Sequence, residues 1–81
     1  MAKVGFFEKK KISREIEDII LLIVQDVANN YKDNAKVNLK KLSKTVENYR
    51  RKDKLEDKDF GRYMNIIKEY EDKLSNWKRT Y

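Results

Sequence analysis

The fold is decided by residues 12–27, which read ISREIEDIILLIVQDV. Apolar side chains recur through this stretch and up to Tyr31 every three or four residues, which is the period of one face of an α-helix. The central run of six apolar residues also suits a buried strand, but polar and small residues on both sides continue the helical period. We therefore expect a helix from about Ser13 to Tyr31, with Ser13 as its N-cap.

This first helix is apolar around most of its circumference. Leu21, Leu22 and Ala28 widen the apolar arc until only a narrow polar strip near Asp18 and Gln25 remains. A helix of this kind must be covered on more than one side. We expect it either to lie at the centre of a helical bundle or to associate with a second copy of the chain.

Two further helices are expected. A narrow apolar stripe predicts a helix from about Ala35 or Asn38 to about Lys52, and its members are Leu39, Leu42, Val46 and Tyr49. Asn34 or Asn38 would cap this helix. We expect the turn before it at Asn29–Asn30 and Asp33–Asn34. The third helix is expected from about Lys54 to Arg79, with Asp53 and Glu56 at capping-box spacing. Because Gly61 weakens its first turns, a start near Phe60 is the alternative.

These helices predict an all-α fold: a three-helix antiparallel bundle, alone or completed by dimerisation. The chain has 81 residues, which is room for one domain. Residues 1–11 precede the expected cap, so we expect them to form an N-terminal arm that is either flexible or folded back as a lid. As a lid, the segment would place Phe6 and Phe7 over the bundle. As a flexible arm, it would use them to dock a partner.

Charge is distributed unevenly along the chain. The formal net charge is +6, and residues 36–54 alone hold eight basic and two acidic groups. In the second helix, basic side chains gather on the arc opposite the apolar stripe, where Lys40 and Lys44 repel each other one turn apart. A face of one sign is typical of a helix that binds a polyanion, or of a solvated face neutralised by a neighbouring helix or protomer.

These observations predict binding of nucleic acid through phosphate contacts. The predicted site residues are Lys40, Lys41, Lys44, Arg51 and Lys52, with Lys9, Lys10 and Lys11 as auxiliary groups. Because most of them are lysines, which act as point charges, we expect binding to depend strongly on salt and little on base sequence. A helix-turn-helix reader is less favoured, since the third helix is too apolar and aromatic to be exposed. Aromatic residues recur on that helix at roughly seven-residue spacing, which is typical of core packing or of a base-stacking platform: Tyr63, Tyr70, Trp77 and Tyr81.

The alternative function is a protein-interaction module, such as an adaptor, inhibitor or assembly factor. Its interface would use the surplus apolar surface of the first helix and the N-terminal arm: Ile20, Leu21, Leu22, Val24, Phe6 and Phe7. In general character the chain is similar to the small helical accessory proteins of mobile elements, viruses and plasmids, and we expect a regulatory or accessory role. No motif assigns it to one of these groups.

Catalysis is not expected. The sequence contains no Cys and no His, so it lacks the usual thiolate nucleophile, general base and transition-metal ligands. Its two glycines do not form a phosphate-binding loop, and no carboxylate spacing resembles a calcium loop, so we expect no cofactor and no metal. The longest apolar run, Ile19–Val24, is far shorter than a membrane span, and apolar residues precede basic ones at the start, which is the reverse of a signal peptide. We expect a cytoplasmic protein.

Overall fold

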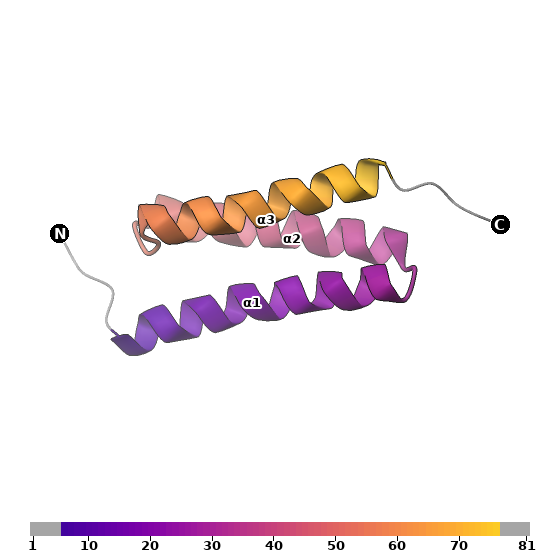
Figure 1. The fold of residues 1–81 in the computed structure, drawn as a ribbon. Coiled ribbons are helices and arrows are strands. Elements are labelled where there is room, and N and C mark those ends of the chain that lie inside the picture. The colour runs from indigo at the N-terminus through magenta and orange to yellow at the C-terminus, as the bar shows by residue number, and fades with distance from the viewer. Residues whose placement is uncertain (1–5, 77–81) are drawn as a thin grey trace.

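Three α-helices make up nearly all of the chain that is described. The computed structural model describes the backbone of residues 6–76 and the side chains of residues 7–76. Over this range the elements are α1 (Phe6–Ala28), α2 (Lys32–Arg51) and α3 (Asp57–Ser75), without a strand. Figure 1 shows successive helices running in opposite directions. The all-α prediction is confirmed.

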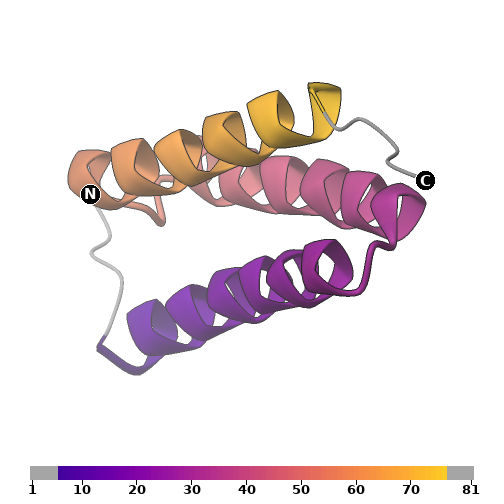
Figure 2. The same ribbon diagram turned by 45° about the vertical axis from the view of Figure 1, so that its right-hand side comes forward.

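The second helix holds the other two together. α2 packs against both α1 and α3, whereas no Cα atoms of α1 and α3 lie within 8 Å of each other. Figure 2 shows α2 between its two neighbours. The wide apolar arc of α1 therefore does not place that helix at the centre, as one of the sequence interpretations would have it.

One apolar core joins all three helices, and each helix contributes a stripe in which gaps of four and three residues alternate, in α3 with the half-buried Tyr70 included. This alternation keeps the side chains on one side of a helix and is the spacing used by packed antiparallel helices. The buried side chains are Ile12, Ile16, Ile19 and Ile23 from α1, Ala35, Leu39, Leu42 and Val46 from α2, Leu55 from the second turn, and Tyr63, Ile67 and Leu74 from α3.

Both turns are closed by a residue in the left-handed region. Asn30 has a φ of 62° and Asp53 a φ of 60°. In each turn the amide of the following residue donates to a carbonyl five residues back, from Tyr31 to Asp26 and from Lys54 to Tyr49. This is the Schellman arrangement, and Asn and Asp tolerate its left-handed position better than most residues do. The turn predicted at Asn29–Asn30 is confirmed, whereas Asp33 and Asn34, which were expected to belong to it, lie within α2.

The first helix begins seven residues before the expected cap. It starts at Phe6, so Ser13 lies within the helix and does not cap it. The turns before Ser13 are joined to the turn between α2 and α3 by two ion pairs, Glu8 with Lys54 and Lys9 with Glu56. Residues 6–11 thus form helix, and the side chain of Phe7 has 85% of its surface exposed. Residues 1–5 and the side chain of Phe6 lie outside the described part.

The other two starts also differ from expectation. α2 begins at Lys32 with Tyr31 at the N-cap position, so Asn34 and Asn38 lie within the helix and neither caps it. Asp33 in its first turn complements the helix dipole. α3 begins at Asp57, between the two expected positions, since Asp53 closes the preceding helix and Leu55 is buried in the turn.

Gly61 lies inside α3 without a structural need for glycine. It has no positive φ, and a Cβ atom added there would meet nothing within 4 Å. We expect Gly61→Ala to raise the free energy of unfolding by about 0.4–1 kcal/mol, because alanine lowers the entropy of the unfolded chain and favours helix. Urea unfolding followed by circular dichroism measures this; an unchanged or lowered stability would contradict the free space at this position.

Leu42 is the central core residue of α2 and is fully buried. We expect Leu42→Ala to destabilise the protein by about 2–5 kcal/mol, through lost burial and the cavity left behind. Val37→Ala on the same helix is the control, because Val37 is 67% exposed. That change should stay within about 0.5 kcal/mol in the same assay. Equal losses for the two variants would mean that α2 packs with a different face.

Candidate nucleic-acid interface

Four of the five predicted basic residues lie on one exposed face of α2, and the fifth, Lys52, is the C-cap residue of that helix. All five are exposed, while the buried stripe of the same helix faces the core. About 100° of rotation per residue places the four within the helix on the arc opposite that stripe. We call this set the basic face: Lys40, Lys41, Lys44, Arg51 and Lys52.

Within residues 7–76, no side chain of the basic face forms an ion pair with a carboxylate. Neighbouring basic residues behave differently. Arg50 pairs with Asp57 and places its guanidinium carbon 4.9 Å from the ring centre of Phe60. Among the described side chains, an adjacent helix therefore does not neutralise the basic face, in contrast to the alternative that the sequence left open.

Exposed Val37 belongs to the same side of α2, one turn before Lys40 and Lys41. Sequence reasoning missed it, because a single valine among polar residues carries no periodic signal. Beside the basic face, a groove of about 370 Å³ runs between α2 and α3, lined by Lys36, Leu39, Lys40, Ser43, Glu71, Leu74 and Ser75. Lys36 and Lys40 outnumber Glu71 in this lining, so the groove carries a net positive charge beside the basic face.

The auxiliary lysines of α1 are not equivalent to the basic face. The Nζ atom of Lys9 lies 2.8 Å from Oε1 of Glu56, in the turn before α3. The hydrogen bond with this carboxylate raises the pKa of Lys9 above its ordinary value and lowers the pKa of Glu56 below 4.5. Lys9 thus links α1 to the turn between α2 and α3. Lys10 and Lys11 are exposed at the same end of the molecule.

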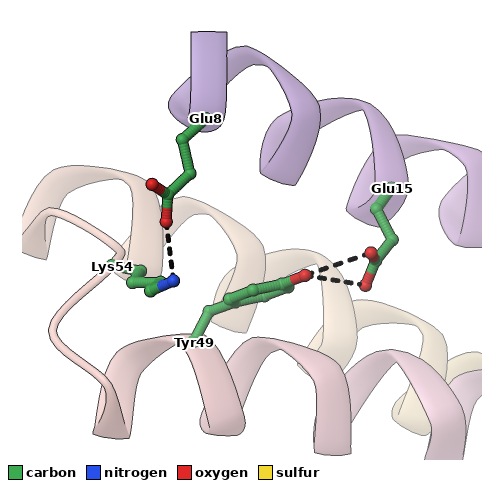
Figure 3. Close-up of polar contacts among 4 residues, drawn as sticks. All are labelled: Glu8, Glu15, Tyr49 and Lys54. Carbon is green, nitrogen blue, oxygen red and sulfur yellow. Dashed lines mark hydrogen bonds and ion pairs between the residues drawn. The ribbon is translucent and has the colours of Figure 1, made fainter. Parts of the chain in front are cut away.

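A second set of polar contacts joins α1 to α2 and to the turn after it, and Figure 3 shows it. Glu8 accepts a hydrogen bond from Lys54 over 2.6 Å, and its carboxylate raises the pKa of Lys54. The hydroxyl of Tyr49 donates to Glu15, at 3.0 Å from Oε1. Burial, followed by this hydrogen bond, raises the pKa of Tyr49. These contacts fix the side of α1 that faces α2.

The two predicted stacking residues of α3 that lie in the described part of the chain pack in or against the apolar core. Tyr63 is buried and Tyr70 packs half-buried against the core, so neither offers a flat exposed ring to a base. Trp77 and Tyr81 lie outside the described residues. Figure 1 shows α3 running back alongside α2, whereas the helices of a helix-turn-helix cross at about 90–120°.

The predicted apolar interface of α1 is only partly available. Ile20 packs half-buried against the core. Leu21, Leu22 and Val24 are 54%, 43% and 41% exposed. These three side chains and Phe7 therefore remain as apolar surface on α1.

Two other kinds of site are not found in the described part of the chain. No group of three or more Asp or Glu residues there is placed to hold a metal ion. None of its helices combines the length and the apolar character needed to cross a membrane. Comparison of the chain with known protein families, curated proteins and solved structures gave no match.

The Lys9–Glu56 pair predicts a pH dependence of stability. Because the pKa of Glu56 is lowered in the folded state, its contribution is present above the ordinary value of 4.5 and is lost as the pH falls through the lowered pKa. We expect Glu56→Gln to reduce the free energy of unfolding at about pH 7 and to make no difference at about pH 2, as measured by urea unfolding.

The matched control is Glu69→Gln, on the exposed side of α3 and without a polar partner among the described residues. It should have no such effect at either pH. A loss for Glu56→Gln that is the same at both pH values would show that the pair does not contribute through its charge.

Proposed function

We propose that the protein binds nucleic acid, in the cytoplasm, through phosphate contacts made by the basic face of α2. The observation that carries this proposal is that four of the five exposed basic side chains share one face of α2 and none of the five has an acidic partner among the described residues. Like charges on one helix face lower stability by a few tenths of a kcal/mol per pair. Phosphate groups of a bound polyanion would remove this repulsion.

The dimensions of the basic face suit a nucleic-acid backbone. From Lys40 to Arg51 the helix advances about 16 Å, at about 1.5 Å per residue. Along one strand of a duplex, phosphates recur about every 3.4 Å, so this length passes about five of them. Four of the five cations are lysines, which act as point charges and do not read base edges in the paired manner of arginine. The binding should therefore tolerate most sequences.

The rest of the molecule would serve as a support for this face. We infer that the three helices form one antiparallel bundle, because a single core connects them and three ion pairs lie at the end that holds the second turn. Such a support keeps α2 straight and its lysines outside the core. A helical bundle that supports an exposed basic face suits a regulatory or accessory role better than catalysis.

A second candidate function is protein association through α1. The observation that favours it is the apolar surface left at Leu21, Leu22 and Val24 after the core is complete. Surfaces of this kind are common at interaction sites. The two functions use different helices and are compatible in one molecule.

The nucleic-acid proposal predicts a strong salt dependence. If all five cations contact phosphates, affinity for duplex DNA should fall about 500-fold between about 50 and 200 mM salt. We expect Lys40→Glu/Lys44→Glu to weaken binding on the order of tenfold or more and to reduce the slope of log K against log salt by about 2. Fluorescence anisotropy with duplex DNA, single-stranded DNA and RNA measures both quantities.

The matched control is Lys58→Glu/Lys68→Glu, which makes the same change in formal charge at exposed positions of α3. It should change affinity by about twofold or less at the higher salt, where distant charges are screened. If the two double variants weaken binding equally, net charge and not the basic face is responsible. Absence of binding at low salt would remove the proposal.

A further inference from the structure

α1 carries a second stripe on the side turned away from the core. Its members again alternate in spacing between three and four residues, and every one of them is exposed: Phe7, Lys10, Arg14, Glu17, Leu21, Val24 and Ala28. We call this set the outer stripe. Any face of a helix has this spacing; what distinguishes the outer stripe is that four of its members are apolar and exposed, which suits it to packing against a further helix.

The two halves of α1 have opposite charge. Residues 6–14 hold four basic groups and one acid, whereas residues 15–28 hold four acids and no basic group. Along the outer stripe, basic Lys10 and Arg14 precede Glu17, and the apolar pair Leu21 and Val24 follows. Neither Arg14 nor Glu17 has an ion-pair partner among the described residues. The helix that best complements this pattern is the same helix running in the opposite direction.

We propose that the outer stripe is the seam of a homodimer in which α1 packs antiparallel to α1 of a second copy. The register that satisfies the charges places Arg14 opposite Glu17 of the second copy, and Glu17 opposite Arg14, at the two-fold axis. The same register puts Phe7 opposite Val24 and the methylene stem of Lys10 against Leu21. A parallel arrangement would instead face Arg14 with Arg14 and Glu17 with Glu17, which is repulsive.

The seam would leave the basic face open. Glu8, Glu15 and Asp26 contact α2 from one side of α1, through Lys54, Tyr49 and Asn38. The outer stripe lies on the other side, so a second copy would not cover α2. The dimer would then carry two basic faces, and two linked sites bind one polymer far more tightly than either alone. The inference rests on the proposal that α1 is an association surface, and it does not depend on nucleic-acid binding.

The test is the mass of the full chain in solution, measured by light scattering after size exclusion at about 10 and about 200 µM, without nucleic acid. We expect twice the monomer mass of 9.8 kDa at the higher concentration. Leu21→Asp should return the mass to that of the monomer. Leu22→Asp is the matched control: Leu22 is the next residue and similarly exposed, but it lies outside the outer stripe, so this variant should remain dimeric.

A charge exchange tests whether the side chains at positions 14 and 17 face the second copy across the seam. Arg14→Glu makes the centre of the seam wholly acidic, and Glu17→Arg makes it wholly basic, so each variant alone should be monomeric. When the two are mixed in equal amounts, every facing pair is again of opposite charge, and the dimer mass should return. An ion pair within one helix would not produce this recovery, because each single variant lacks it.

Three results would overturn the proposal. A monomer mass at both concentrations would exclude the homodimer and leave α1 to a different protein. Equal loss of dimer in Leu21→Asp and Leu22→Asp would place the interface elsewhere. A mixture of the charge variants that stays monomeric would exclude the antiparallel register. Circular dichroism of each variant confirms that it is folded, so a loss of dimer is not mistaken for unfolding.

Discussion

The arrangement of the whole molecule depends on the apolar stripe of α2, which must pack against two neighbours at once. Ala35, Leu39, Leu42 and Val46 occupy a narrow part of its circumference. On one flank, Asn38 and Tyr49 bond to carboxylates of α1, and on the other, Arg50 pairs with the start of α3. Only the remaining arc is exposed to solvent, and the lysines occupy it. The same packing that builds the core therefore sets the direction in which the positive charge faces.

Periodicity was sufficient to predict the class of the fold and most of the core. The three stripes are visible in the sequence because each repeats every three or four residues. The helix starts could not be obtained this way. The first turns of α1 contain no apolar stripe of their own, and the contacts that anchor them, Glu8 with Lys54 and Lys9 with Glu56, join residues more than 45 positions apart. Local preference at Ser13 gave the wrong boundary because these distant partners outweigh it.

The sequence predicted where the candidate site residues lie on the helices, but not which of them are paired with a carboxylate. The spacing of the lysines in α2 was enough to place them on the outer arc, and the structure puts them there. Lys9 and Lys40 look alike in the sequence, yet one is paired with a carboxylate and the other has no acidic partner within the described residues. Similarly, the wide apolar arc of α1 did not reveal which residues the core would use. Only the packing separates half-buried Ile20 from exposed Leu21.

The absence of backbone packing between α1 and α3 has a consequence for how the chain reaches this fold. Since α1 meets α2 and α2 meets α3, close backbone approaches between helices occur only between helices that are neighbours in the sequence. The contacts that matter most are therefore local, and helical domains of low contact order fold within microseconds to milliseconds. Either helical hairpin can form first, with α2 as the shared template.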